Sequence, residues 1–469
     1  MTDAAPTPTL WADLRAALRG TGADYTRIPL KRAVFLLAIP MMLELVLEST
    51  FAVVDIFFVA KLGASAVATV GLTETYLFLL YSVAMGLAMA VTAVVARRVG
   101  EQRGDEAALS AVQAMLLAVL ASVPVALAGI FWAQDLLRLM GADAWSIEHG
   151  YRYTQWMLGG NVVILLLFVI NAIFRGAGDA AAAMHVLWVA NALNIALDPI
   201  LIFGWGPIPA MGVEGAAIAT NIGRGAGVLM QLCILARGSQ HLHLVGASLR
   251  WHGATLLHIA RTSLGGIGQM IIAMTAWIFL MRILASLSTE AVAGATIAMR
   301  VMMFTLMPAW GMSNAAATLV GQNLGAGQPE RSEAAVWRIG WMNMGFTLVV
   351  SVLFFLRHDA IIGLFTDEAA VIAIGGEWLS ILAWSYFVYG WWMVAVQAFN
   401  GAGDTLTPTW INLVFFWLIQ IPLAWLLARP LGWGHSGVFW GVFVSETAVG
   451  LFTLWLFSRG GWKLAPANS

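Results

Sequence analysis

Charge is scarce in this sequence. Only 10% of its 469 residues are Asp, Glu, Lys or Arg, whereas soluble globular domains carry about 25%. Hydrophobic residues make up 60% of the chain, and the mean hydropathy is +0.83. Uncharged runs recur from Lys31 to Arg459 and leave no polar stretch long enough for a separate soluble domain. The composition excludes a soluble enzyme and predicts an integral membrane protein.

Cysteine, basic excess and catalytic motifs are lacking too. The one cysteine, Cys233, excludes an intramolecular disulfide and a CxxC site, and its apolar surroundings predict a packed small hydrophobe. A net charge of −1 argues against nucleic acid as a partner. No Ser-His-Asp, HExxH or Walker pattern occurs, so we expect neither an enzyme nor a cofactor. Four histidines without cysteine or carboxylate partners predict a solvated loop rather than a metal site: His241, His243, His252 and His258.

What the chain does contain is twelve apolar segments of membrane-spanning length, at roughly 20 residues each. They lie near 33–60, 66–96, 110–133, 152–174, 180–204, 210–236, 256–285, 291–320, 335–357, 376–399, 407–428 and 436–458. Continuous apolar runs such as 162–170 do not alternate as barrel strands would. The prediction is an all-α membrane fold.

Arginine and lysine fall mainly on one side of these spans, which predicts that both termini are cytoplasmic. We expect a cytoplasmic tail over 1–30, with no cleaved signal peptide, six spans over 31–236, a cytoplasmic linker over 237–255, six spans over 256–458 and a second tail over 459–469. Abundant alanine and arginine with few lysines indicate a GC-rich bacterial gene, and therefore a multi-pass protein of the bacterial inner membrane.

The chain also contains an internal repeat with an offset of 225 residues. The shift superposes FxGAGD at 174–179 on FxGAGD at 399–404, and Gly86 and Gly100 on Gly311 and Gly325. Each half holds an even number of spans, so the two copies have the same orientation, as in transporters with parallel repeats. In the two repeated turns, glycine permits tight bends, and Asp179 and Asp404 are expected to cap the next helix.

Acidic residues inside spans are the strongest functional signal, because an acid at the bilayer centre costs about 2.5–3.5 kcal/mol on insertion scales. The first span contains Glu44, Glu48 and Asp55, which fall within about 40° of one another on a helix. One face of this helix is therefore acidic. Pro40 lies one turn before Glu44 and removes a backbone hydrogen bond, so the two halves of the helix are expected to be able to bend against each other there.

Polar residues of the fourth and fifth spans extend this cluster. Asn194 and Asp198 share a helix face, and Asn171 lies inside the fourth span. The repeat replaces all six polar positions of the first half by residues without charge: Gln269, Ala273, Leu280, Val396, Ile419 and Leu423. A requirement of the shared fold would appear in both halves, so we expect an ion or substrate site in the first. The alternative is that these carboxylates line a water-filled cavity without titrating.

At this point the sequence resembles the multidrug and toxic compound extrusion (MATE) family over residues 30–460, most closely its DinF-type branch. The motifs that carry the resemblance are Pro40 to Asp55, KLG at 61–63, FRGAGD at 174–179, NxxxDP at 194–199, LVGQNLGAG at 319–327 and NGAGD at 400–404. The resemblance implies two six-helix lobes in a V around a central cavity. It also implies export of organic, often cationic, compounds in exchange for protons or sodium ions.

The resemblance assigns roles to particular residues. Asp55 matches an aspartate associated with proton coupling; Asn171, Asn194 and Asp198 match the polar cluster around it, and Glu48 lies on the same face. Pro40 matches the proline at which the first helix is proposed to bend. We expect the substrate cavity to be lined by Glu44, Phe51, Gln269 and Arg300. The sodium-associated branch carries acids inside spans seven and ten, where this chain has none, which favours protons over Na⁺.

Two alternatives stay open. A sodium ion could be bound in the first half through the oxygens of Asp55, Asn194 and Asp198. A flippase for lipid-linked precursors has a related fold, but it would need several cavity arginines or lysines, and only Arg224 and Arg300 lie deep in spans. The roles of Glu74, Arg224, Arg300 and Glu446 are not decided by the sequence. We expect small organic molecules and membrane lipid as partners, and a monomer.

Overall fold

The structure, a computed structural model, describes residues 9–238, 242 and 250–464. Within these ranges it is almost entirely helical. No strand is formed there, and Trp205 and Ile208 make an isolated β-bridge. In the part of the chain that the structure describes, eleven helices are long and apolar enough to cross a membrane, and one bent pair supplies a twelfth span. The predicted all-α fold with twelve spans is confirmed.

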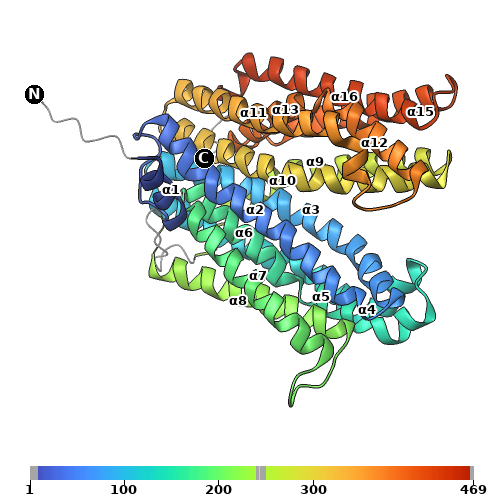
Figure 1. Cartoon of the computed structure of the whole chain (residues 1–469). Helices are drawn as coiled ribbons and strands as arrows, with labels where there is room; N and C mark the ends of the chain where they lie inside the picture. Colours follow the sequence, from blue (N-terminus) through green and yellow to red (C-terminus); the bar gives the residue numbers. More distant parts are fainter. Residues whose placement is uncertain (1–8, 239–241, 243–249, 465–469) are drawn as a thin grey trace, which may run out of the picture.

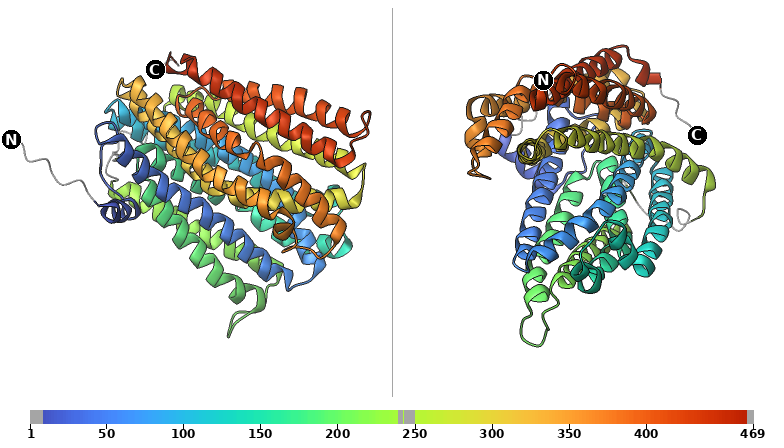
Figure 2. Two further views of the ribbon diagram at one scale, coloured as in Figure 1. Left: turned by 45° about the horizontal axis from the view of Figure 1, so that its top comes forward. Right: turned by 90° about the vertical axis from the view of Figure 1, so that its right-hand side faces the viewer.

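The helices form two lobes that meet at the end of the molecule carrying α1 (Leu10–Arg19), called here the α1 end, and diverge toward the far end (Figures 1 and 2). The first lobe comprises α2 (Leu30–Ala60), α3 (Ala64–Gly100), α4 (Gly104–Leu139), η1 (Ser146–Gly150), α5 (Tyr151–Gly159), α6 (Asn161–Ala177), α7 (Ala180–Phe203) and α8 (Val213–Arg237). The second lobe comprises α9 (Gly253–Ala285), α10 (Thr289–Gly325), α11 (Pro329–Ile362), α12 (Ala369–Ala383), α13 (Tyr386–Gly401), α14 (Leu406–Asn412), η3 (Leu413–Gln420), α15 (Ile421–Ala428) and α16 (Gly434–Ser458). A short η4 (Gly461–Leu464) follows.

The sequence repeat is also a structural repeat. Helices α3 and α10 have 37 residues each, and both their first and last residues are 225 positions apart. The fourth span is interrupted at Gly160, and the tenth is interrupted at the corresponding Ser385. There α12 and α13 bend by 62°. Irregular features as well as helices therefore recur in both lobes.

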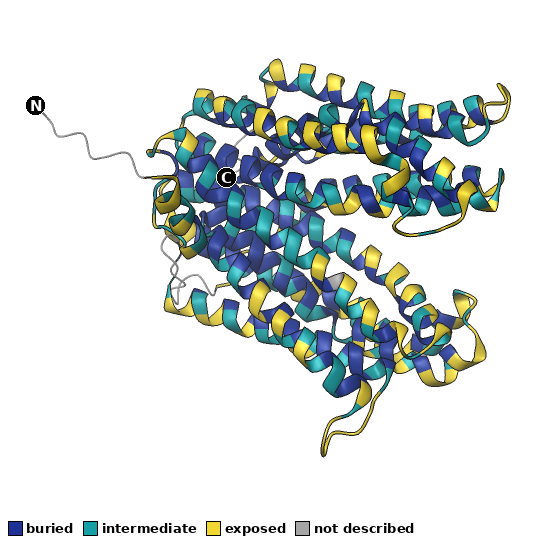
Figure 3. Ribbon diagram, in the orientation of Figure 1, coloured by how far each residue is buried: buried dark blue, intermediate teal, exposed yellow. Residues whose placement is uncertain are grey.

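Repeated glycines explain how closely the lobes approach each other. A Cβ atom on Gly86 of α3 would lie 2.4 Å from the main-chain nitrogen of Ile267 on α9. A Cβ atom on Gly311 of α10 would lie 2.5 Å from the carbonyl oxygen of Met41 on α2. No side chain fits at either position, so each lobe presents a glycine surface to the other. Buried residues gather inside each lobe and where the lobes meet (Figure 3).

Hydrogen bonds between the lobes reinforce this contact at the α1 end. The Thr318 hydroxyl donates to the carbonyl of Arg175 at 3.1 Å, and the Gln322 amide donates to the carbonyl of Gly176 at 2.9 Å. These carbonyls lie at the end of α6, where its last carbonyls need partners outside the helix. The two repeated turns follow as expected: Asp179 accepts from the amide of Ala182 at 3.2 Å, and Asp404 accepts from that of Thr407 at 3.1 Å.

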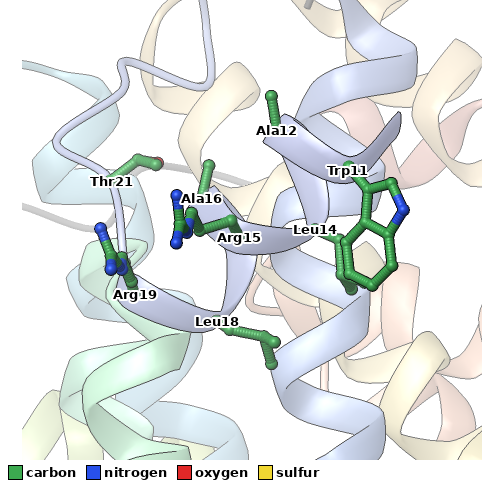
Figure 4. Close-up of a pocket in the computed structure, with 9 residues that line it drawn as sticks. Trp11, Ala12, Leu14, Arg15, Ala16, Leu18, Arg19 and Thr21 are labelled. Carbon is green, nitrogen blue, oxygen red and sulfur yellow. The ribbon is translucent and has the colours of Figure 1, made fainter. Parts of the chain in front are cut away.

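Helix α1 lies within the segment expected as a tail. Asp13 pairs with Arg32 at 2.9 Å and fixes α1 to the start of α2. The helix lines a surface hollow of about 910 Å³, with Trp11 on one side and Arg15 and Arg19 on another (Figure 4). The N-terminal segment is therefore folded onto the first lobe from residue 10 onward.

The prediction for Cys233 was wrong, because its side chain is exposed on the outer surface of α8 rather than packed. A lipid-facing surface is as apolar as a protein core, so hydropathy does not distinguish the two positions. Of the four histidines predicted to lie in a solvated loop, His241 and His243 lie outside the described residues, and His252 is exposed at the start of α9. The prediction was wrong for His258, which is half-buried inside α9. Among the residues that are described, no three His, Cys, Asp or Glu side chains form a group that could hold a metal ion.

Candidate functional site

The polar side chains of the first lobe form three successive layers along α2, which lies against α7 (Figure 1). The layers are centred on Glu44, Glu48 and Asp55. At 1.5 Å per residue, Glu48 and Asp55 lie about 6 and 17 Å beyond Glu44, toward the far end. Helix α2 runs through Pro40 as a single helix, so its acidic face is continuous.

The first layer contains a buried ion pair. Arg175 at the end of α6 donates through Nη1 to Glu44 Oε1 at 2.9 Å, and only 13% and 4% of the two side chains are exposed. Asn171, one turn earlier on α6, donates to the same oxygen at 3.3 Å. The side-chain oxygen Oδ1 of Asn171 in turn accepts a hydrogen bond from the Gln231 amide of α8 at 2.7 Å. This layer ties α2, α6 and α8 together.

The second layer contains another acid facing an arginine. Glu48 accepts from Asn191 of α7 at 3.4 Å and lies 3.8 Å from Arg224 Nη2. Arg224 also donates to the Tyr81 hydroxyl of α3 at 2.9 Å. The role of Arg224, which the sequence left undecided, is therefore to balance Glu48 and to connect α8 with α3.

The third layer contains two acids, and no basic side chain of the described residues lies at hydrogen-bonding distance from them. The carboxyl groups of Asp55 on α2 and Asp198 on α7 lie within hydrogen-bonding reach of each other. Oδ1 of Asp55 and both oxygens of Asp198 are buried without a hydrogen-bond donor among the described residues. Close by in sequence, Asn194 donates to the Thr220 hydroxyl at 3.1 Å, and its own carbonyl oxygen is also buried without a donor.

Two ionised carboxylates in contact repel each other, and each would also lose its hydration on burial. A proton or another cation between them would relieve both costs. A proton provides the missing hydrogen bond directly, because a protonated carboxyl group is a donor.

The four residues expected to line the substrate cavity differ in how far they are exposed. Glu44 is ion-paired and 3% exposed, Phe51 is 7% exposed and Gln269 is 1% exposed. Gln269 instead exchanges hydrogen bonds with Asn400 inside the second lobe, at 2.9 and 3.3 Å. Of the four, only Arg300 on α10 is exposed. Packing covers the other three side chains.

Sequence reasoning missed the partners that complete the layers. Arg175, Asn191, Tyr81, Thr220 and Gln231 all come from helices other than α2. A signal for some of them was present: Asn171 and Arg175 are four residues apart, and so share a face of α6. Which helix that face meets is decided by tertiary packing.

Comparison with known proteins extends these observations. The sequence model of the MatE family matches residues 40–200 and again residues 267–426, once in each half of the chain. A probable multidrug resistance protein NorM of Thermotoga maritima is 28% identical over 438 residues, covering 92% of this chain and 93% of that protein. An FAD transporter of Shewanella oneidensis is 26% identical over 407 residues, covering 84% and 88%.

A solved structure shows the same architecture. It is the outward-facing conformation of a multidrug resistance MATE family transporter of the MOP superfamily, with 25% identity and a TM-score of 0.87. The match covers 95% of this chain and 99% of that one. Two lobes of six spans each are thus shared over almost the whole length.

Proposed function

Because the chain belongs to the MatE family of membrane transporters, we propose that it exports organic, often cationic, compounds in exchange for protons that bind at Asp55 and Asp198. The observation that carries the proposal is the contact between these two carboxyl groups, whose buried oxygens have no donor among the described residues. Of the other polar residues of this lobe, Asn194 lies close to Asp198 in sequence, Glu48 belongs to the second layer, and Asn171 belongs to the first layer, where it donates to Glu44.

The asymmetry between the lobes supports this assignment. At the corresponding positions of the second lobe, Leu280 and Leu423 replace the two aspartates, although the helices themselves are repeated. Two acids that the fold does not require, placed in contact in an apolar environment, are suited to binding and releasing a proton.

The proposed cycle uses the proton as a switch of charge. Protonation of Asp55 from outside removes its attraction for a cationic substrate and lets α2 bend at Pro40, which contracts the first lobe and releases the substrate. The lobes then rock, and the proton leaves inside. With both termini in the cytoplasm, a membrane potential of 100 mV contributes about 2.3 kcal/mol for each charge moved inward.

The test compares the parent with Asp55→Asn in ethidium efflux from cells and in proton release from purified protein on substrate addition. We expect the variant to lose coupled efflux and most of the release. Asp404→Asn is the matched control, since it makes the same chemical change where the acid caps a helix and asparagine also caps. Coupled efflux that is unchanged in Asp55→Asn would overturn the proposal.

The choice of ion needs a separate measurement. Proteoliposomes with either a proton or a sodium gradient distinguish the two, and we expect the proton gradient alone to drive transport. Transport driven by sodium alone would instead assign the Asp55 layer to Na⁺. A flippase for anionic lipids is disfavoured because Arg175 and Arg224 are already paired with Glu44 and Glu48.

A further inference from the structure

A carboxyl group that the proposed function does not use lies in the second lobe. Glu446 is near the middle of α16, on the same side of this helix as the buried residues Val442, Val449 and Gly450. Among the described residues, no hydrogen bond or ion pair reaches its carboxyl group. An acid at this depth without a partner requires an explanation.

The internal repeat offers a direct comparison, because position 446 corresponds to Asn221 in the first lobe. The Asn221 side chain donates through Nδ2 to the carbonyl of Trp156 and to that of Ala217, both at 3.0 Å. Trp156 lies one turn before Gly160, where the fourth span is interrupted. Asn221 thus supplies a donor to a carbonyl beside this interruption.

Glu446 lies beside the corresponding interruption of the tenth span. The phenol groups of Tyr386 and Tyr389, in the first turn of α13, are close enough to interact electrostatically with its carboxyl group. One turn further along α16, Gly450 packs against Val388 and Trp392. The same face of α16 therefore meets the start of α13, directly after the bend at Ser385. Broken helices at mid-membrane depth are frequent at ion sites of transporters.

Among the described residues, no charged side chain is found to act on the carboxyl group of Glu446. Tyr386 and Tyr389 of α13 are the titratable groups that act on it within the described chain. Glu377 of α12 is hydrogen-bonded to His435 and Ser436 in the first turn of α16, about three turns from Glu446. Helices α15 and η3, which also pack on α16, contain no titratable side chain.

An ionised carboxylate cannot replace Asn221, because it accepts hydrogen bonds and repels carbonyl oxygens. A protonated carboxyl group can replace it, since its hydroxyl is a donor like an amide N–H. We propose that Glu446 binds a proton, which it donates to a main-chain carbonyl at the break between α12 and α13. It is a second proton-binding site, in the lobe opposite to Asp55. This inference goes beyond the proposed function and does not require that Asp55 couples transport.

Infrared difference spectroscopy of the purified full-length protein tests this occupancy. We expect a carbonyl-stretch band of a protonated carboxylic acid at neutral pH that Glu446→Gln removes and Asp55→Asn retains. Asn221→Asp, which places an acid at the corresponding position of the first lobe, should add a band of the same kind.

Other outcomes would overturn the inference. If Glu446→Gln removes a carboxylate band instead, Glu446 is ionised and does not hold a proton. If neither band changes, the residue holds no exchangeable proton. Should Glu446→Gln fail to fold, Glu446→Asn, which copies position 221, provides the same readout. Failure of Asp55→Asn in transport would leave these spectra unaffected, so the two proposals are tested separately.

Discussion

The buried pair of Glu44 and Arg175 has a natural replacement elsewhere in the same chain. Shifted by 225 residues, the pair becomes Gln269 and Asn400, which are neutral and exchange two hydrogen bonds at the same place in the second lobe. The double variant Glu44→Gln/Arg175→Asn therefore copies into the first lobe a solution that the fold already uses.

The magnitudes follow from burial. Removing one partner of a buried ion pair costs about 3–5 kcal/mol, because the other charge is left unpaired. With only 4% of the Glu44 side chain exposed, solvent cannot replace Arg175, and Asn171 at 3.3 Å is the other donor that the described residues provide. We expect each single variant to lose this amount. The double variant should lose at most about 2 kcal/mol, since neutral replacements of buried pairs are often tolerated.

The assay is equilibrium unfolding in mixed micelles of sodium dodecyl sulfate and a mild detergent, followed by the fluorescence of the 22 tryptophans. The four proteins form a double-mutant cycle, and the predicted interaction energy is several kcal/mol. Additive effects of the two single variants would refute the reasoning, as would a Glu44→Gln protein as stable as the parent.

Two further predictions concern packing. Gly311→Val should destabilise the protein by about 1–3 kcal/mol and impair transport, because its side chain would meet the main chain of α2. Gly345→Val on α11 is the control, because a Cβ atom added there would meet no atom of another element within 4 Å, and it should behave as the parent in the same unfolding and efflux assays. Cys233 should react with a hydrophobic maleimide in native detergent-solubilised protein, because its side chain is exposed; labelling that occurs only after denaturation would show that the thiol is packed inside.

Most of the fold could be predicted because a membrane span is a local property. The length and composition of each apolar run determine whether it crosses the bilayer, and the structure begins α7 at the predicted residue 180 and ends α9 at the predicted residue 285. The repeat could be found for a similar reason, since its glycines must recur wherever the lobes touch.

The partners of the buried polar residues could not be predicted in the same way. Helical spacing places Glu44, Glu48 and Asp55 on one face, but which helices meet that face depends on how the helices are rotated and packed. The arginine that balances Glu44 lies 131 residues away in the sequence. Cys233 and Gln269 show the same limit, because hydropathy describes a segment and not the direction in which one side chain points.

Arg175 has two attachments of different kinds. Its guanidinium group binds Glu44 of α2, and its main-chain carbonyl accepts the hydrogen bond from Thr318 of the opposite lobe. A displacement of α2 that moves Glu44 therefore pulls on a residue that also holds the lobes together. No further residue is needed to transmit such a movement. Arg175 alone connects the acidic face of α2 to the hydrogen bonds that join the two lobes.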